Sequence, residues 1–149
     1  MNAAPAKPQV LDRPSVAARW WSWWCRYRLP NLLCGRLYVT DTDSIAWVLY
    51  NHEGRGRVRV LAVLEVVPWG ANLEARRSSM AAIRTLAARA RVPFFVVEVD
   101  HRQARFRVRT GYGLHVIVGR SSEAGFASWL DNLASMQQPS PDADTLPDW

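Results

Sequence analysis

The sequence predicts an α/β fold of the α+β kind, in which a central mixed sheet is flanked by helices. Segments rich in β-forming residues alternate with segments of helical periodicity, and one helical segment lies between two apolar, strand-like runs. Such a strand–helix–strand unit takes a right-handed crossover, whereas the hairpin expected before it is antiparallel. The 149 residues are 49% hydrophobic, which suits one compact domain.

Composition changes at both ends of the chain. Residues 1–13 are rich in proline and have little periodicity, so we expect a flexible arm, and residues 136–149 form an acidic tail that cannot bury a core. The folded domain is predicted to span residues 14–135. No apolar run approaches the roughly 18 residues that a membrane helix needs, and no signal peptide is visible, so we expect a cytoplasmic protein without membrane contact.

The first helix is expected to begin at Ser15, an N-cap residue after a proline, and to stop before Pro30. Apolar residues at helical spacing form its stripe: Val16, Trp20, Trp23, Trp24 and Tyr27. These tryptophans can stack on bases or anchor at a membrane surface, but packing of the helix on the sheet is favoured. Cys25 and Cys34 are expected to be buried thiols rather than zinc ligands.

A hairpin is predicted next, from residues 37–50 and 58–67 with turn residues between them. Residues 71–91 form the crossover helix, with an apolar face of Leu73, Met80, Ile83, Ala87 and Ala90. A buried strand follows Pro93, an alternating strand covers residues 104–110, and residues 114–118 can add a further strand. The last helix begins near Ser122 and carries Phe126, Trp129, Leu130 and Leu133.

Three acids lie inside the two strands of the predicted hairpin: Asp41, Asp43 and Glu65. Side chains alternate along a strand, so Glu65 shares a face with Leu61, Val67 and, by the same parity, Arg59. We expect Asp43 and Glu65 to converge at one end of the sheet. Convergent carboxylates suit Mg²⁺, which prefers oxygen ligands and can activate a water for attack on a phosphodiester.

Arginine supplies eighteen of the nineteen basic residues, and Lys7 is the only lysine, so the folded region has no lysine for catalysis. Between residues 14 and 135, seventeen arginines and nine acids leave a charge of +8, which favours an anionic partner such as nucleic acid. Three arginine sets recur at regular spacing and can track a phosphate backbone: Arg55, Arg57, Arg59; Arg77, Arg84, Arg91; Arg105, Arg107, Arg109. Charged faces also occur in any soluble protein.

Several short motifs between residues 20 and 133 carry a family resemblance: RLP after the tryptophan-rich helix, D-T-D at 41–43, V-L-E-V at 63–66 and LAARARVPFFVV at 86–97. In this order they resemble the PD-(D/E)xK nuclease superfamily, especially small phage and bacterial proteins. The resemblance implies a restriction-endonuclease-like αβββαβ core and hydrolysis of DNA that depends on Mg²⁺ or Mn²⁺. It also implies a bacterial or phage-infected host.

Carried over residue by residue, the resemblance makes Asp43 the first metal ligand, Glu65 the second and the Val66 carbonyl the third, with Asp41 as an outer or alternative ligand. Thr42 stands in place of the motif proline. The larger departure is Val67, which holds the position of the lysine that orients the attacking water in the family.

Three explanations of Val67 compete. Arg59 or Arg77 replaces the lysine, or the site binds metal without turnover, or the acids are relics and Glu65 pairs with an arginine. Arginine is a poor base because of its very high pKa, so we expect weak or absent nuclease activity. DNA is the favoured partner, bound through Arg55, Arg57, Arg84, Arg105, Arg107 and Arg109.

The alternative function is a catalytically inactive nuclease-fold protein that acts as a binding or structural partner in a phage or mobile element. The acidic tail, which ends in Trp149, is then a candidate contact for a protein partner.

Overall fold

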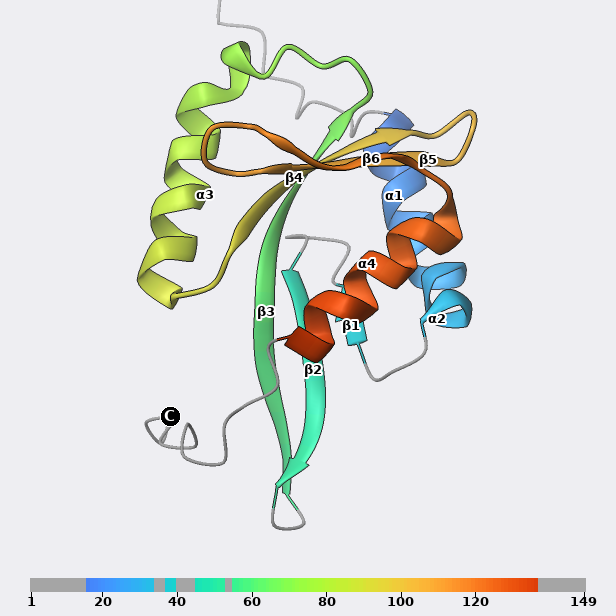
Figure 1. The fold of residues 1–149 in the computed structure, drawn as a ribbon, viewed down its shortest axis with the longest axis vertical. Coiled ribbons are helices and arrows are strands. Elements are labelled where there is room, and N and C mark those ends of the chain that lie inside the picture. Colours follow the sequence, from blue (N-terminus) through green and yellow to red (C-terminus); the bar gives the residue numbers. More distant parts are fainter. Residues whose placement is uncertain (1–15, 34–36, 40–44, 53–54, 137–149) are drawn as a thin grey trace, which may run out of the picture.

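The computed structural model describes residues 16–33, 37–39, 45–52 and 55–136 (Figure 1). Its elements, in chain order, are α1 Val16–Tyr27, α2 Leu29–Leu32, β1 Leu37–Val39, β2 Ile45–His52, β3 Arg55–Pro68, the short 3₁₀ helix η1 Glu74–Arg76, α3 Arg77–Ala90, β4 Phe94–Asp100, β5 Arg105–Thr110, β6 Val116–Ser121 and α4 Glu123–Met136. Of the predicted arm and tail, only Met136 is among the described residues. Within the described part of the chain, no helix has the length and apolar character to cross a membrane.

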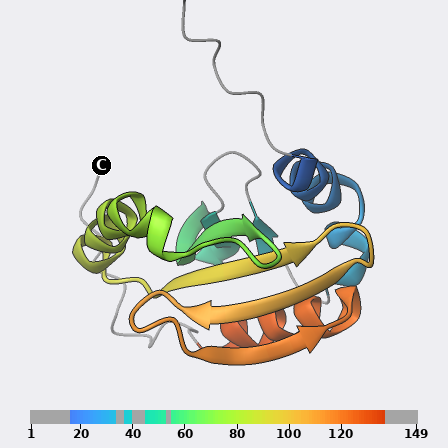
Figure 2. The same cartoon turned by 90° about the horizontal axis from the view of Figure 1, so that it is seen from above.

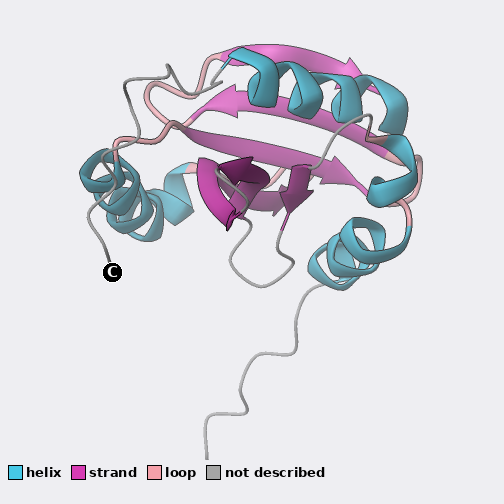
Figure 3. Cartoon of the chain, turned by 90° about the horizontal axis from the view of Figure 1, so that it is seen from below, coloured by secondary structure: helices cyan, strands magenta, loops and turns pink. Residues whose placement is uncertain are grey.

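The six strands form one sheet in chain order, from β1 to β6. Neighbouring strands are antiparallel except β3 and β4, which are parallel and are connected through η1 and α3. This architecture confirms the predicted α+β fold with a mixed sheet flanked by helices. Figures 2 and 3 show α3 and α4 on different sides of the strands.

Alternation along β4 distributes the core between the two faces of the sheet. Val97 and Val99 pack with α1 and α4 in the main core, whereas Phe94 and Val96 pack with Met80 and other residues of α3 in a smaller cluster. The side that faces α3 is called the α3 face below. Because different helices cover the two faces, the side chains of each face have a separate set of neighbours.

Aromatic rings dominate the main core. The rings of Phe106 and Phe126 stack with centroids 4.6 Å apart, and the ring of Trp24 lies 4.7 Å from that of Phe106. Trp24 also donates a hydrogen bond of 2.7 Å from Nε1 to Glu123, at the start of α4. The tryptophan-rich helix therefore packs on the sheet, as the sequence favours.

The face of α1 that packs differs from the predicted stripe. The buried residues are Ala17, Trp21, Trp24 and Cys25. Val16, Trp23 and Tyr27 are exposed, so their assignment to the packed stripe was wrong. Tryptophans occur on several sides of this helix, so periodicity alone did not determine which side would meet the sheet.

The predicted strand at residues 37–50 is two antiparallel strands, β1 and β2. Asp41 and Asp43 fall between Val39 and Ile45, outside the described residues. The hairpin of β2 and β3 is confirmed, with Ile45 opposite Val63 and His52 opposite Arg55. The strand expected at residues 114–118 is confirmed as β6, which begins at Val116.

Candidate functional site: the carboxylates beneath α3

Glu65 lies on the α3 face of β3, between Val63 and Val67 in the alternation of that strand. Val63 and Val67 both belong to the cluster beneath α3, so the alternation predicted around Glu65 is confirmed. The Glu65 side chain is 21% exposed. Burial raises the pKa of the Glu65 carboxyl, and the positive charge of Arg76 acts in the opposite direction.

Arg76, in the short η1 helix, is the cation beside Glu65. Its Nη1 atom lies 3.9 Å from Glu65 Oε1, which is an ion pair but too long for a hydrogen bond. Among the described residues, no hydrogen bond reaches the Glu65 carboxylate. Within the described part of the chain, this carboxylate therefore has lone pairs that a further ligand can use.

The two arginines expected to replace the missing lysine lie elsewhere. Arg77 Nη2 contacts Glu74 Oε2 at 2.9 Å in an exposed ion pair. The sequence E-A-R-R places Arg76 and Arg77 side by side, and the transition from η1 to α3 decides which of them turns toward β3.

Arg59 is separated from Glu65 by a β-bulge, which the parity argument missed. Ala62 lies opposite Ala46 and Val60 opposite Trp47, so Leu61 is an extra residue in β3. Residues that face each other across a ladder share a side, so Val60 lies on the side of Glu65, and Arg59 on the other. The predicted shared face was wrong for Arg59, and also for Leu61, which belongs to the main core.

The bulge leaves Arg59 in an unusual setting. Its Nη1 atom is buried without a hydrogen-bond partner among the described residues. The backbone of β3 is described from Arg55, but the side chains of Arg55 and Arg57 lie outside the described part.

Val67, at the position of the family's lysine, is completely buried. It packs in the cluster with Met80 and Phe94, and its register neighbour on β4 is Glu98. A side chain at this position points into the core beneath α3 rather than into an open site. Valine is therefore a structural part of this interface.

Glu98 is a second carboxylate on the α3 face, and the sequence analysis did not single it out. It is 2% exposed and lies within the apolar strand after Pro93. Arg107 Nη2 donates to Glu98 Oε1 at 2.9 Å, and Arg109 Nε donates to Oε2 at 2.8 Å. Burial alone would raise the pKa of Glu98, but the hydrogen bonds and charges of the two arginines outweigh it and lower the pKa.

The signal for Glu98 was present in the sequence. It is a carboxylate inside an apolar run, which is the same argument that singled out Glu65. The alternating arginines of β5, the strand paired with β4, supply the required cations.

These contacts change the interpretation of the predicted phosphate-binding arginines. Arg107 and Arg109 are held by Glu98, and Arg84 donates from Nη2 to the Gly111 carbonyl at 2.9 Å while lying over the Tyr112 ring. Arg105 is partly buried. Three of the six predicted contacts therefore already have partners within the protein.

The metal-ligand set is placed only in part. Glu65 and Val66 are adjacent on β3, whereas Asp41 and Asp43 lie outside the described residues. Within the described segments, no group of three or more His, Cys, Asp or Glu side chains is arranged to hold a metal ion. Convergence of Asp43 with Glu65 stays a prediction.

Comparison of the chain with known protein families, with characterised proteins and with solved structures finds no match. The arguments for function therefore come from the fold and from the contacts of the residues described above.

Proposed function

We propose that this chain is a nucleic-acid-binding protein with a PD-(D/E)xK nuclease-like fold, in which metal-dependent hydrolysis is weak or absent. One observation carries the proposal: Glu65 lies, largely buried and without a hydrogen bond among the described residues, on the strand that enters the α3 crossover. Apart from the short helices α2 and η1, the order α1, β1, β2, β3, α3, β4 supports the αβββαβ core that the resemblance implies.

Register supports a place for Asp43 near Glu65. Ile45 lies opposite Val63, and Glu65 is two residues beyond Val63 on the same side of β3. Covalent geometry keeps Asp43 within about 7 Å of Ile45, because it is two residues away. A hairpin ladder that continued by two residues would bring Asp43 opposite Glu65.

The donors near Glu65 suit a hard divalent cation. Its carboxylate is free of hydrogen bonds within the described part, and Val66 and Asp43 would add oxygen ligands. A bound Mg²⁺ or Mn²⁺ would supply charge stabilisation and an activated water. Glu65 would hold the ion, and Arg76 would compete for the same carboxylate and would also stand near a bound phosphate.

Val67 favours binding without efficient turnover. No ammonium group lies two residues after Glu65, and Arg76 can stabilise negative charge but is a poor base. This also supports the second candidate, a catalytically inactive nuclease-fold protein that binds a partner in a phage or mobile element.

Nucleic-acid binding should be strongly dependent on salt. The +8 charge of residues 14–135 supports contacts with phosphates. In fluorescence anisotropy with labelled DNA, log affinity should fall linearly with log salt, with a slope of about −0.9 for each phosphate contacted on a duplex. Absence of binding at about 50 mM salt, or affinity independent of salt, would contradict the proposal.

Hydrolysis is tested with plasmid and single-stranded DNA in Mg²⁺ or Mn²⁺, with EDTA as the control. We expect little or no cleavage. Robust cleavage that EDTA abolishes would show that Arg76 or another group replaces the lysine, and Arg76→Ala would then be the first variant to examine.

Metal binding can be measured apart from catalysis. If Glu65 holds the ion, Mg²⁺ or Mn²⁺ should raise the melting temperature, and Glu65→Ala and Asp43→Ala should each abolish the increase. Glu74→Ala, in the exposed pair with Arg77, is the matched control and should retain it. An equal increase in the wild type and in Glu65→Ala would place the metal elsewhere.

The acidic tail should be dispensable for folding. Deletion of residues 139–149 removes three aspartates, so we expect a nearly unchanged melting temperature and tighter DNA binding. Weaker DNA binding after the deletion would instead make the tail a contact.

A further inference from the structure

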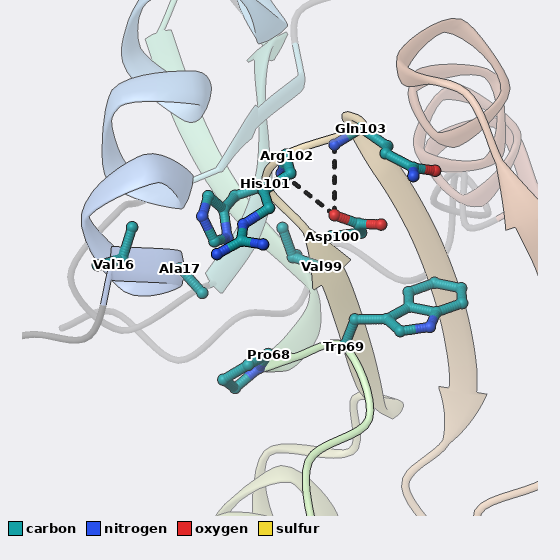
Figure 4. Close-up of a pocket in the computed structure, with 9 residues that line it drawn as sticks. All are labelled: Val16, Ala17, Pro68, Trp69, Val99, Asp100, His101, Arg102 and Gln103. Carbon is teal, nitrogen blue, oxygen red and sulfur yellow. Dashed lines mark hydrogen bonds between the residues drawn. The ribbon is translucent and has the colours of Figure 1, made fainter.

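A hollow of about 540 Å³ lies at the carboxyl ends of the two parallel strands (Figure 4). Nine residues line it: Val16, Ala17, Pro68, Trp69, Val99, Asp100, His101, Arg102 and Gln103. The volume lies within the range of small-molecule sites, about 300–1,000 Å³. Ligands of open α/β sheets characteristically bind at this end of the strands.

The wall of the hollow is apolar, and its rim is polar. Val16, Ala17, Pro68 and Val99 come from α1 and from the ends of β3 and β4. The rim is the turn between β4 and β5, which begins at Asp100.

The shape of this turn is fixed by the Asp100 carboxylate. Its Oδ1 atom accepts hydrogen bonds from the backbone N–H groups of Arg102, at 3.1 Å, and Gln103, at 3.3 Å (Figure 4). The exposed Arg102 and the partly buried His101 are thereby presented at the rim on a constrained turn. The Asp100 carboxylate keeps its negative charge, so the group at this rim that can attract an anion is the Arg102 side chain.

The Trp69 ring is held in place by cation–π contacts with two arginines, one of which is itself bound by a carboxylate. The Arg107 guanidinium lies over the Trp69 ring, with Cζ 4.3 Å from the centroid, and Arg120 Cζ lies at 6.0 Å. Arg107 is in turn bound by the buried Glu98. The Trp69 backbone N–H donates to the Val99 carbonyl at 3.0 Å. The indole is therefore a preorganised aromatic surface at the edge of the hollow.

We propose that this hollow binds a nucleotide, with its base against Trp69 and its phosphate at Arg102. A planar ring beside an anionic group matches an aromatic surface beside a cation. Pro68 follows Glu65 by three residues, about 10 Å along a strand. Residues of α1 line one side of the hollow and none of its lining residues belongs to α3, so it is distinct from the Glu65 site.

The ligand is either a free nucleotide or the nucleotide at the unpaired end of a DNA strand. The second of these rests on the proposed function. Deoxyadenosine monophosphate is the first probe, titrated into the full-length protein and followed by NMR chemical shifts. Deoxyadenosine and inorganic phosphate are titrated in parallel. We expect the nucleotide to bind more tightly than either part, because both the base and the phosphate have a contact.

Two variants test the contacts. Arg102→Ala should weaken nucleotide binding by about tenfold or more, through loss of a charge-assisted hydrogen bond. Trp69→Ala should weaken it by about tenfold, and Trp69→Phe should retain most of it because an aromatic face remains. Arg89→Ala and Trp23→Ala remove an exposed arginine and an exposed tryptophan outside the hollow, so both should leave the affinity unchanged.

The second probe is a DNA duplex with a one-nucleotide overhang, compared with a blunt duplex. A preference for the overhang that is lost in Trp69→Ala identifies a strand end as the ligand, whereas mononucleotide binding without such a preference identifies a free nucleotide. No mononucleotide binding at millimolar concentration, or binding unchanged in Arg102→Ala and Trp69→Ala, overturns the inference. If the inference is overturned but DNA binding is salt-dependent, the proposed function is still supported. Mononucleotide binding without DNA binding overturns the proposed function alone.

Discussion

Replacement of Glu98 by alanine should lower the free energy of unfolding by about 3 kcal/mol or more. The substitution removes the carboxylate that Arg107 and Arg109 share and leaves two cations without their partner at a largely buried position. The two arginine side chains are 25% and 23% exposed, so water recovers part of the loss. Chemical denaturation followed by circular dichroism measures the change.

Glu74→Ala is the matched control, because Glu74 also pairs with an arginine but is 72% exposed. Exposed pairs contribute about 0–1 kcal/mol, so this variant should be nearly as stable as the wild type. Equal effects of the two substitutions would contradict a structural role for the buried cluster.

The same cluster predicts how stability depends on pH. The folded-state pKa of Glu98 is lowered, so its contribution is present above its ordinary value of 4.5 and is lost as the pH falls through the lowered pKa. Glu98→Gln should remove this part of the acid sensitivity. An unchanged acid-unfolding profile in that variant would exclude Glu98 as its source.

Val67→Lys should destabilise the fold by about 4 kcal/mol at neutral pH, rather than simply restoring a missing catalytic group. Val67 is completely buried, and a buried lysine loses several pKa units, each worth about 1.4 kcal/mol. The nearby carboxylates of Glu65 and Glu98 would offset part of this cost. Urea denaturation at several pH values measures both the loss and its dependence on protonation.

Val60→Lys is the control for that substitution, because Val60 lies on the same strand and is 39% exposed. It should change stability by less than about 1 kcal/mol. If the Val67→Lys variant were as stable as the wild type, the packing of α3 would not exclude water from this position. Mg²⁺-dependent cleavage gained by Val67→Lys, and lost again with Glu65→Ala, would show a site that lacked only its lysine.

The two substitutions test different properties of the α3 face. Glu98 is part of the charge network that fixes Arg107, and through it Trp69, so a milder variant such as Glu98→Gln should also weaken binding at the hollow. Val67 belongs to the apolar cluster beneath α3, so its effects are expected mainly on stability and on the Glu65 site.

The sequence by itself determined the class of fold, most of the order of its elements and the side of β3 that Val63, Glu65 and Val67 share. These features depend on periodicity within a few residues, and a strand places Val63, Glu65 and Val67 on one side whatever packs against it. It also indicated the crossover helix, whose Met80 and Ala87 are buried as expected.

Only the tertiary structure decided which groups meet across elements. The extra residue at Leu61 reversed the parity of Arg59, and no local pattern marks such a bulge. The turn through η1 brought Arg76 rather than Arg77 to Glu65, and the docking of α3 buried Val67. Periodicity indicates which side chains share a face of a helix or strand. Long-range packing decides which other element that face meets, and the contacts that determine the chemistry form between those two elements.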